Sequence, residues 1–448
     1  MEVETRQRPI QSKVLETTPV KRQMDALKVA VEMAQEEMDY ESAHDKEVIK
    51  AIHIVEDYLR KSGRVCYGGQ AINAHLPNKL KFYDEEYDVP DFDFFTPNAE
   101  KDINDLVLAL QKEGFTDISE KAGVHEGTRK IYVNFVPIAD ITNLPLDLYK
   151  KYAKNSISVA GVRYINEDIL RMMMYLEMSR PRGEVERWNK VYERLTLLNA
   201  AKPIHRCTER TPRINNIPPK IRQKLLEYLI QEKRVLAGAE IGFIYRSYSQ
   251  PQPPRMTWFL YSGGPLLFFS PNLEKDTEAI LEIIGPKGIT VQRKNGFGDY
   301  VPNRNVIRKN RQIVAYLIDE TSCNSYNDIP IENAGMIRVA SLDTLVYLYL
   351  MLGLITDEAK TLGISLLCLA QRYVELLNKM RNSRHSRFPS FSIKCSGHQK
   401  TIKSLIRERA LRAEKEKGKN KTGKRKLGSN LKPKGKTQTR KIKNEKTR

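Results

Sequence analysis

The segment Pro90-Asp91-Phe92-Asp93-Phe94-Phe95 places two carboxylates in an apolar, aromatic run that predicts a β-strand. Because side chains alternate between the two faces of a strand, Asp91 and Asp93 share one face. Two acids on a half-buried strand repel each other and are costly to desolvate unless a cation pairs with them. The segment therefore predicts a cation site.

A third acid follows further along the chain. Asp140 lies in a second apolar run, Ile138-Ala139-Asp140-Ile141, and we expect it to come from a neighbouring strand. Three converging carboxylates are the hard oxygen ligands that a pair of Mg²⁺ ions needs, with water and substrate phosphates at the other positions. Asp91, Asp93 and Asp140 are therefore the candidate catalytic and metal-binding residues.

A Gly-Gly pair precedes the acids, in Cys66-Tyr67-Gly68-Gly69-Gln70-Ala71. Glycine has no Cβ, so a phosphate can approach the backbone N–H groups at the start of the helix expected from Gln70. An isolated Asp-x-Asp also occurs at solvated strand ends, and an isolated Gly-Gly is more often a simple turn. The order of the three segments favours a nucleotidyltransferase site, with Gly68, Gly69 and Gln70 as candidate nucleotide-binding residues.

Length and composition bound the class of protein. A chain of 448 residues suffices for two to three domains, and a hydrophobic fraction of 40% is ordinary for a soluble protein. The longest apolar run, residues 345–355, is too short to span a bilayer, and residues 1–13 do not resemble a signal peptide. The five scattered cysteines disfavour both a zinc site and a disulfide framework, and they suit a reducing compartment.

The net charge of +20 is concentrated at the C-terminal end. Residues 400–448 contain 20 Lys and Arg against four Glu, so this tail alone has a net charge of +16. A block of like charge with few apolar residues cannot bury a core and is expected to be disordered. It is either a solubilising or localising tail or, as we favour, a salt-sensitive and sequence-independent contact with a nucleic-acid backbone.

The segments between these motifs predict a mixture of helices and strands. Apolar spacing predicts a helix over 45–60 and a short strand over 64–67, before the Gly-Gly pair. After Phe95 we expect Thr96 to cap a helix that Gly114 ends, and a strand over 130–136 to lead towards Asp140.

A helical region follows, over 168–177 and 184–199. We interpret its Met-rich part, residues 172–174, as core. Arg187 and Lys190 are three residues apart, so they share a helix face that could bind a triphosphate or an RNA backbone. A solvated basic face is an equally good interpretation of the two residues.

The chain also resembles itself at an offset of 174 residues. Phe94-Phe95-Thr96-Pro97-Asn98-Ala99-Glu100-Lys101-Asp102 recurs as Phe268-Phe269-Ser270-Pro271-Asn272-Leu273-Glu274-Lys275-Asp276, with seven of nine positions identical. The helix that follows is apolar at the same positions in both copies. Helix capping explains the Thr or Ser and the Pro, but not the paired Phe, the Asn or the Lys-Asp. We infer a duplicated domain.

The second copy lacks the chemistry of the first. At the same offset Pro265 and Leu267 replace Asp91 and Asp93. Asp319, which lies at a different offset, is the one candidate for the place of Asp140. The expected domains are a polar, helix-prone segment (1–44), a catalytic nucleotidyltransferase domain with trailing helices (45–200), a catalytically silent duplicate (201–395) and a basic disordered tail (396–448). We expect the silent copy to serve as an interface or a substrate platform.

The motifs as a set are similar to those of a known family. They resemble the catalytic subunit of the poly(A) polymerases of large DNA viruses, of the poxvirus, mimivirus and African swine fever virus types. The residues that carry this resemblance are Gly68-Gly69-Gln70-Ala71, Pro90-Asp91-Phe92-Asp93, Ile138-Ala139-Asp140 and Arg187-Trp188. It spans roughly residues 47–379 and leaves out the tail.

The resemblance implies an α+β, polymerase β-like nucleotidyltransferase fold that uses ATP, with Mg²⁺ or Mn²⁺ as cofactor, to add adenylates to an mRNA 3′ end. It implies that Asp91, Asp93 and Asp140 ligate the metals and that Gly68 and Gly69 face the triphosphate. A degenerate second domain, a homodimer and a location in the host cytoplasm, in the viral factory or the virion, are also implied. The superfamily usually has Gly-Ser followed closely by the acids, whereas this chain has Gly69 and a long gap.

The mechanistic hypothesis is in-line attack of an RNA 3′-hydroxyl on the α-phosphate of ATP, with release of pyrophosphate. All three acids would hold one metal, and Asp91 and Asp93 would hold the other. The acids do not separate this activity from a terminal uridylyltransferase or an oligoadenylate synthetase, because side chains of the base pocket set base choice. A catalytically silent RNA-binding protein is the alternative outside enzymes, and the three intact acids argue against it.

Overall fold

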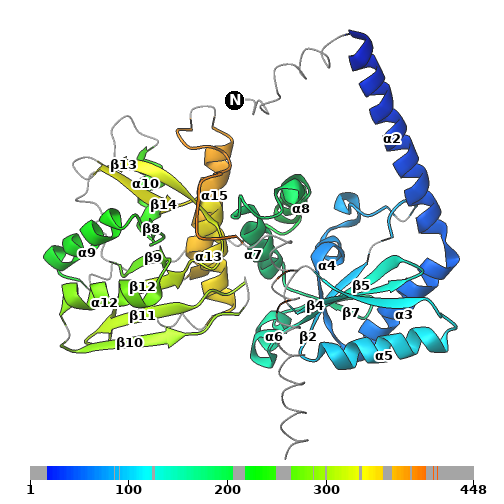
Figure 1. The fold of residues 1–448 in the computed structure, drawn as a ribbon, viewed down its shortest axis with the longest axis horizontal. Coiled ribbons are helices and arrows are strands. Elements are labelled where there is room, and N and C mark those ends of the chain that lie inside the picture. The colour runs from blue at the N-terminus through cyan, green and yellow to red at the C-terminus, as the bar shows by residue number, and fades with distance from the viewer. Residues whose placement is uncertain are drawn as a thin grey trace, which may run out of the picture. The chain divides into compact units, whose positions relative to one another are not determined.

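The structure is a computed structural model that describes residues 18–399, with gaps at 85, 90, 124–126, 205–216, 249–263, 286, 298–299, 332–334, 357–365 and 384–385, together with residues 407 and 411. The described chain contains two mixed β-sheets with helices packed against them (Figure 1). This confirms the expected α+β class. Within the described ranges no helix has both the length and the apolar character that a bilayer span needs. Of the predicted tail (396–448), only residues 396–399, Arg407 and Leu411 lie within the described residues.

The first sheet has the strand order β3-β4-β5-β2-β1-β7-β6. Its strands are β1 (Val65–Tyr67), β2 (Phe92–Thr96), β3 (Ile118–Ala122), β4 (Thr128–Val133), β5 (Val136–Asn143), β6 (Ile157–Val159) and β7 (Val162–Tyr164). The central strands β2 and β5 are parallel and place Asp93 opposite Asp140. On the other side of β2, the antiparallel strand β1 places Tyr67 opposite Asp93. The register therefore brings two of the three acids together at the centre of the sheet.

Helices lie on both sides of this sheet. They are α2 (Thr18–His44), α3 (Lys46–Ser62), α4 (Gly68–His75), α5 (Ala99–Lys112), α6 (Leu146–Ala153), α7 (Glu167–Met178) and α8 (Trp188–Ala201), with 3₁₀ turns η1 (Asn78–Leu80) and η2 (Val185–Arg187). The helices α3 and α5 cover one face, and α3 buries the helically spaced Val48, Ala51, Val55 and Leu59 there. On the other side α4 contacts β1, β2, α7 and α8, so the face of the sheet that carries Asp93 looks towards α4 and α8.

Two local predictions were wrong. The N-cap of α5 is Asn98, whose side chain accepts a hydrogen bond from the Lys101 N–H at 3.1 Å. Thr96 ends β2, and its hydroxyl accepts from the Asn98 N–H, so it supports the capping residue. The expected strand over 130–136 is a hairpin, because Asn134 and Phe135 have positive φ angles of 49° and 67° and turn the chain between β4 and β5. Asn suits this conformation and Phe does not, so the turn gave little signal in the sequence.

The second sheet repeats the order of the first, as β10-β11-β12-β9-β8-β14-β13, and adds β15. Its strands are β8 (Val235–Leu236), β9 (Leu266–Ser270), β10 (Ile289–Lys294), β11 (Arg304–Lys309), β12 (Gln312–Asp319), β13 (Asn324–Ile331), β14 (Gly335–Ala340) and β15 (Cys395–Ser396). Its helices are α9 (Pro219–Gln231), α10 (Ile241–Tyr248), α12 (Leu273–Ile284), α13 (Leu342–Leu354) and α15 (Leu366–Arg381). Each of the first six neighbouring pairs has the same relative direction as its counterpart in the first sheet.

A buried ion pair is repeated as well. In the first half Asp102 accepts hydrogen bonds from Arg64 and from the Tyr58 hydroxyl. In the second half Asp276 accepts the same set from Arg234 and Tyr228. Asp102 and Asp276 are both fully buried, so each carboxylate depends on these donors. The shared topology and this shared cluster support the inferred duplication.

The register also shows what stands in place of each acid. Leu267 lies opposite Tyr316, just as Asp93 lies opposite Asp140, so Tyr316 occupies the position of the third acid. Asp319 is opposite Ser270, further along the strand, and the suggestion that it corresponds to Asp140 was wrong. The offset of 174 fails here because the second half has two additional residues between β9 and β12.

The glycine turn of the second half is filled by a carboxylate. Val235 pairs with Phe269 as Val65 pairs with Phe95, so Gly238 and Glu240 take the places of Gly68 and Gln70. A Cβ placed on Gly238 would overlap the Glu240 carboxylate, which is buried 3.7 Å from Arg222. Burial raises the pKa of Glu240, and Arg222 opposes this rise. An anion from the chain itself therefore lies against this turn.

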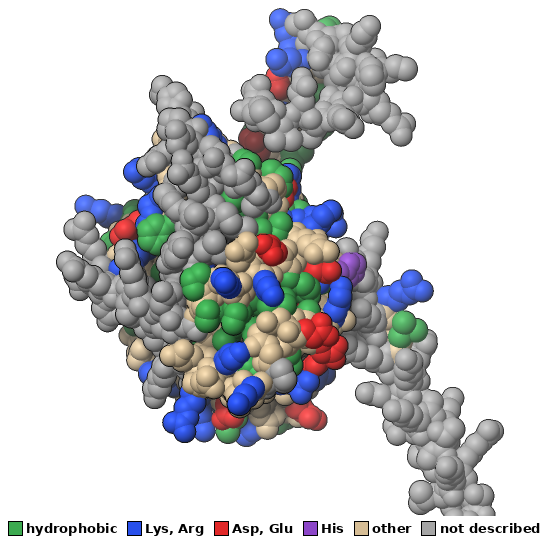
Figure 2. All heavy atoms as spheres, turned by 90° about the vertical axis from the view of Figure 1, so that its left-hand side faces the viewer, with side chains coloured by type: hydrophobic (Ala, Val, Ile, Leu, Met, Phe, Trp, Pro, Cys, Tyr) green, Lys and Arg blue, Asp and Glu red, His purple; other side chains and the backbone are tan. Residues whose placement is uncertain are grey.

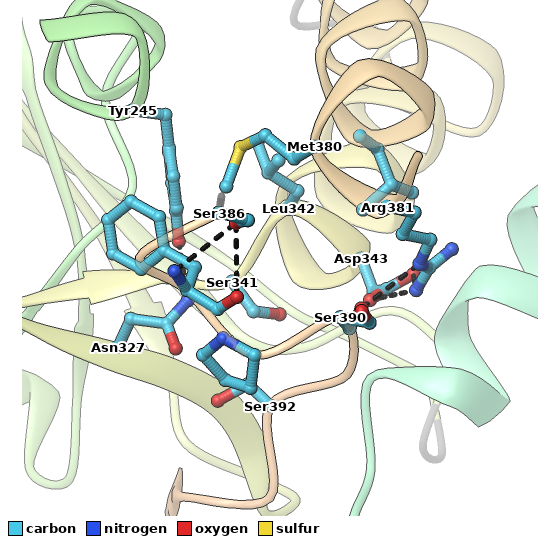
Figure 3. A pocket seen from close by; sticks show the side chains of 13 residues that line it. Tyr245, Asn327, Ser341, Leu342, Asp343, Met380, Arg381, Ser386, Ser390 and Ser392 are labelled. Atoms are coloured by element: carbon cyan, nitrogen blue, oxygen red, sulfur yellow. Dashed lines mark hydrogen bonds and ion pairs between the residues drawn. The ribbon is translucent and has the colours of Figure 1, made fainter. Parts of the chain in front are cut away.

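A pocket in the second half lies between α13, α15 and the segment that follows α15 (Figure 3). It is lined by several serines and by the ion pair of Asp343 with Arg381, whose shortest N–O distance is 2.8 Å. The Arg381 guanidinium also lies over the rings of Phe391 and Tyr192, at 4.0 and 5.3 Å from their centroids. None of the three candidate catalytic acids lines this pocket.

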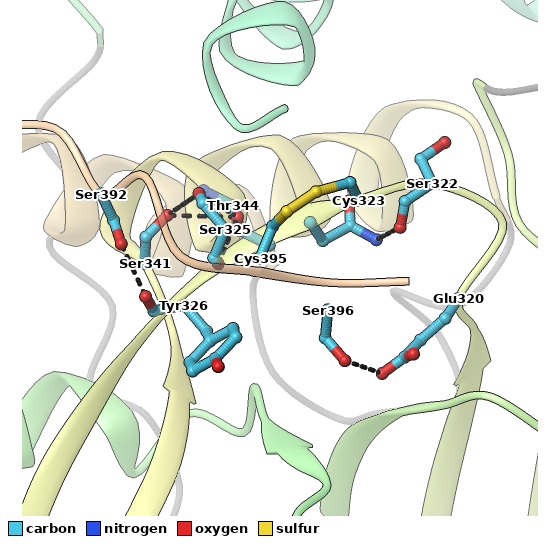
Figure 4. The surroundings of a disulfide bond; sticks show 11 residues. Glu320, Ser322, Cys323, Ser325, Tyr326, Ser341, Thr344, Ser392, Cys395 and Ser396 are labelled. Atoms are coloured by element: carbon cyan, nitrogen blue, oxygen red, sulfur yellow. Dashed lines mark hydrogen bonds between the residues drawn. A yellow bond between two sulfur atoms is a disulfide. The ribbon is translucent and has the colours of Figure 1, made fainter. Parts of the chain in front are cut away.

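A disulfide joins Cys323 to Cys395, with Cα atoms 5.2 Å apart, and fixes β15 beside the start of β13 (Figure 4). The expectation from cysteine spacing was wrong for this pair. The two residues are separated by 72 positions, and their approach depends on the path of the chain after α15. Cys66 is a free, buried cysteine, as its place in an apolar strand suggests.

Candidate active site

Three carboxylates converge at one end of the central strands of the first sheet. One oxygen from each of Asp91, Asp93 and Asp140 lies within 4.8 Å of the other two. Asp91 directly precedes β2, Asp93 is on β2, and Asp140 is on β5. The alternation of side chains predicted that Asp91 and Asp93 share a face, and the parallel register adds Asp140 to it. The structure thus brings together the three acids that the sequence singled out.

The electrostatics of this cluster are unfavourable without a cation. Burial, with Asp91 and Asp140 nearby, raises the pKa of Asp93 well above its ordinary value. Burial and the charge of Asp140 raise the pKa of Asp91 in the same way. Asp140 is only 8% exposed, and its Oδ1 atom has no hydrogen-bond partner among the residues that the structure describes. Buried carboxylates with unused lone pairs are the ligands that hard divalent cations take in proteins.

Lys130 is the nearest cation from the chain. It lies on β4 directly opposite Asp140, and its Nζ atom is 2.5 Å from Asp140 Oδ2. Although burial acts in the opposite direction, the bond to Asp140 raises the pKa of Lys130. One ammonium offsets part of the charge of three carboxylates, so the cluster remains anionic when all three are ionised.

The glycine turn lies directly against the acids. Gly68 begins α4 with a φ of +71°, and a Cβ at this position would overlap the Asp93 carboxylate. This explains the need for glycine on two counts, a left-handed backbone and close contact with an acid. The turn therefore stands where the sequence placed it, at a helix N-terminus beside the candidate metal ligands.

Tyr83 covers the second glycine. A Cβ on Gly69 would overlap the Tyr83 hydroxyl, and Arg194 lies next to both. The Arg194 guanidinium is 4.5 Å from the centroid of the Phe82 ring and donates a long hydrogen bond of 3.5 Å to the Tyr83 hydroxyl. Burial raises the pKa of Tyr83, and the charges of Asp91 and Asp93 contribute to this rise. A nucleotide phosphate at Gly69 would meet Tyr83 and Arg194 first.

The predicted basic residues face the same region. Burial raises the pKa of both Asp93 and Asp91. The positive charges of Arg187, near Asp93, and of Lys190, near Asp91, oppose this rise with a smaller effect. Arg187 ends η2 and is paired with Glu177 and Glu184, and Lys190 follows in α8. Burial, with Arg194 and Arg187 nearby, lowers the pKa of Lys190. Arg187 and Lys190 are exposed beside the anionic site, and their role in phosphate binding stays a prediction.

Gln70 lies half-buried in the first turn of α4, and its role as a nucleotide-binding residue stays a prediction. Sequence reasoning missed Lys130, Tyr83 and Arg194. Arg194 could have been found, because it follows Arg187 by seven residues and Lys190 by four and shares their helix face. Lys130 required the register of β4 against β5. Tyr83 comes from a charged connection without periodicity.

Comparisons with known proteins show what this part of the chain is similar to. Residues 53–184 match the family of poly(A) polymerase catalytic subunits. This segment contains the glycine turn and all three acids, and the resemblance inferred from the sequence is confirmed. The matched segment is less than half of the chain.

Relatives agree with this match. The putative poly(A) polymerase catalytic subunit of Acanthamoeba polyphaga mimivirus is 31% identical over 158 residues, which are 34% of this chain and 26% of the relative. The putative poly(A) polymerase catalytic subunit of an African swine fever virus isolate from Kenya is 27% identical over 168 residues, 36% of this chain and 35% of the relative. The chain thus aligns with about a quarter to a third of the length of these relatives.

The fold extends the similarity beyond the aligned sequence. The crystal structure of the Megavirus polyadenylate synthase superposes with a TM-score of 0.72 at 18% sequence identity, covering 89% of this chain and 84% of that one. At this identity the comparison establishes the fold alone. The similarity of fold therefore extends well beyond residues 53–184.

Proposed function

We propose that this chain is a template-independent poly(A) polymerase, which transfers AMP from ATP to the 3′ end of an mRNA. The observation that carries the proposal is the approach of Asp91, Asp93 and Asp140 to within 4.8 Å of one another beside the Gly68 turn. The family match of residues 53–184 supports it. The three acids are the proposed catalytic residues, and the glycine turn and α8 are the proposed triphosphate site.

The residues present fit a divalent metal. The cluster provides oxygen ligands alone, it is desolvated, and Asp140 Oδ1 is unpaired among the described residues. Asp91, Asp93 and Asp140 would hold Mg²⁺ or Mn²⁺. When bound, these ions supply charge stabilisation for the pentavalent phosphate and lower the pKa of the acceptor hydroxyl.

The chain itself contributes binding and orientation. The backbone N–H groups after Gly68 and the cations of Arg187, Lys190 and Arg194 would hold the β- and γ-phosphates against the start of α4. The hydroxyl of Tyr83 must move from Gly69 when a phosphate arrives there, and it can then donate a hydrogen bond to that phosphate. The RNA 3′-hydroxyl would attack the α-phosphorus opposite the bond to the bridging oxygen of pyrophosphate, which is the leaving group.

The test is incorporation of radiolabelled AMP into a short RNA primer by the purified chain with ATP and Mg²⁺. Asp93→Asn keeps the size of the side chain and removes its charge, and we expect loss of incorporation by at least about a thousandfold, as when a major charge-stabilising group is removed. The matched control is Asp117→Asn, which changes an exposed acid directly before β3 and should keep activity. Normal tailing by the Asp93→Asn variant would disprove the assignment.

Offering each NTP separately separates this activity from related ones. Preference for UTP would indicate a uridylyltransferase, and synthesis of short oligoadenylates from ATP without primer would indicate an oligoadenylate synthetase. Extension that is equally fast in EDTA would refute the metal site.

We also propose that the tail binds RNA. Deletion of residues 400–448 should weaken RNA binding and flatten its salt dependence while single-nucleotide transfer stays unchanged. On the described face of the second half, basic and acidic side chains are interspersed (Figure 2), so this face offers no comparable concentration of positive charge. An unchanged affinity and salt slope would show that the tail has another role.

A homodimer, which the family resemblance implies, and a location in a cytoplasmic viral factory complete the proposal. The location is supported by the relatives from mimivirus and African swine fever virus. Sedimentation at micromolar concentration tests the first, and imaging of infected cells tests the second.

A further inference from the structure

The sheet face that carries the acids continues past Asp140 onto β4 and β3. Successive side chains of a strand point to opposite faces, so Lys130 and Tyr132, which are two residues apart, point to the same face of β4. Lys130 is opposite Asp140 on one side and opposite Lys121 on the other, and Tyr132 is opposite Ser119. Two lysines and a tyrosine thus lie in a row beside the candidate metal ligands.

This row is accessible. The Lys121 ammonium lies 4.5 Å from the centroid of the Tyr132 ring, Lys121 is exposed, and Tyr132 is half-buried. Within the described ranges Lys121 has no ion pair with a carboxylate. The Tyr132 ring lies next to the Lys121 ammonium and on the same face as Lys130, which is paired with Asp140. An aromatic ring beside an ammonium group combines the two contacts that single-stranded nucleic acids take, stacking of a base and pairing with a phosphate.

The position of the row suits the acceptor strand. Gly68 follows β1, on one side of β2, whereas β4 and β3 lie on the other side of β5. An in-line displacement needs the attacking hydroxyl and the leaving pyrophosphate on opposite sides of the phosphorus. If the triphosphate is bound at the glycine turn, the acceptor reaches the acids from the β4 side. Neighbouring strands are about 4.8 Å apart, so β4 and β3 extend over the length of about two nucleotides.

We propose that Lys121, Lys130 and Tyr132 form the binding platform for the last two nucleotides of the acceptor RNA. A base that stacks on Tyr132 takes the place of the Lys121 ammonium, which then pairs with the adjacent phosphate. Lys130 lies between this phosphate and Asp140 and keeps the two anionic groups apart. The proposal rests on the proposed function, because that function defines which side of the acids the acceptor occupies.

The second half provides a matched comparison. Gln292, Val306 and Arg308 occupy the same three positions in its sheet, as the registers of β10, β11 and β12 show. Arg308 donates a hydrogen bond to Gln292 at the surface, and no acid of a catalytic cluster is near. The platform chemistry is therefore confined to the half that has the acids.

The experiment measures binding of a 5′-fluorescein oligoadenylate of six nucleotides by the full chain in EDTA, by fluorescence anisotropy. Tyr132→Leu keeps an apolar side chain on the strand but cannot stack a base, and we expect affinity to fall about five- to 100-fold. Tyr132→Phe should stay within about twofold of the unchanged chain, and so should Arg308→Ala. Circular dichroism and thermal unfolding verify that each variant is folded.

Equal affinity of the Tyr132→Leu and Arg308→Ala variants would overturn the platform, as would absence of oligoadenylate binding by the unchanged chain. With ATP and Mg²⁺, Tyr132→Leu should raise the KM for primer about tenfold and leave the KM for ATP unchanged. Normal primer extension together with unchanged binding by Tyr132→Leu refutes the platform and keeps the proposed function. If Tyr132→Leu binds the oligoadenylate less tightly but the unchanged chain extends no primer, the platform is supported and the proposed function is refuted.

Discussion

Replacing Asp93 by Asn should stabilise the metal-free protein. At 4.8 Å, the largest separation within the cluster, two ionised carboxylates repel by about 3.5 kcal/mol at an effective dielectric constant of 20. Asp93 has two such neighbours, and Lys130 next to Asp140 offsets part of this repulsion. Desolvation adds to the cost of the ionised form, since burial is the main cause of the raised pKa of Asp93.

We expect a net gain of about 1–3 kcal/mol in the free energy of unfolding at neutral pH, or roughly 2–10 °C in the unfolding temperature. The assay is thermal unfolding in EDTA, followed by circular dichroism, for the unchanged chain, Asp93→Asn and the exposed control Asp117→Asn. Repeating it at 10 mM Mg²⁺ should stabilise the unchanged chain and have little effect on Asp93→Asn, because an ion that binds the native state stabilises it by mass action.

Two results would refute this reasoning. An Asp93→Asn variant that is no more stable than Asp117→Asn in EDTA would mean that the three carboxylates do not repel one another, and thus do not lie together. Equal stabilisation of both variants by Mg²⁺ would mean that the ion binds elsewhere.

Three further predictions follow from the same region. Gly68→Ala forces a left-handed alanine against the Asp93 carboxylate and should reduce AMP incorporation about a hundredfold, with a loss of about 1–2 kcal/mol of stability by urea unfolding. Lys130→Met removes the positive charge beside Asp140, so calorimetry should show Mg²⁺ bound about 3–10 times more tightly, while the metal-free unfolding temperature falls; weaker Mg²⁺ binding would contradict this. Burial lowers the pKa of His75, whose Nε2 donates a hydrogen bond to the Ile165 carbonyl. As the pH falls, the unfolded state therefore binds a proton at His75 before the folded state does. The free energy of unfolding should decrease below about pH 6.5, by at most about 1.4 kcal/mol per pH unit. Urea midpoints at pH 7.5 and 5.5 should show this loss in the unchanged chain and a smaller one in His75→Gln.

The sequence was most informative where chemistry and periodicity coincide. Asp91 and Asp93 could be placed on one face because a strand has a fixed period of two, and Asp140 because an apolar run surrounds it. The duplication could be inferred because a turn and a helix have similar residues at a constant offset. These signals are local, so they survive without knowledge of the tertiary fold.

The missing parts depend on contacts between distant segments. Lys130 meets Asp140 only through the register of a hairpin whose turn contains Phe135, an unusual residue for a positive φ. Tyr83 reaches Gly69 from an irregular connection, and Cys323 meets Cys395 through the path after α15. The error over Asp319 has a similar cause, because Asp319 lies 179 positions after Asp140 and only the register of β9 against β12 identifies Tyr316 as the counterpart.

The inferred duplication makes the second half a copy without the acids, and the carboxylate at its glycine turn would make a return to catalysis difficult. Reintroducing aspartates at positions 265, 267 and 316 would recreate the acids, yet the Glu240 side chain would still exclude an incoming phosphate from Gly238. Removing Glu240 would in turn take away the carboxylate that lies 3.7 Å from the buried guanidinium of Arg222. A site like that of the first half would therefore require coordinated changes at four or more positions.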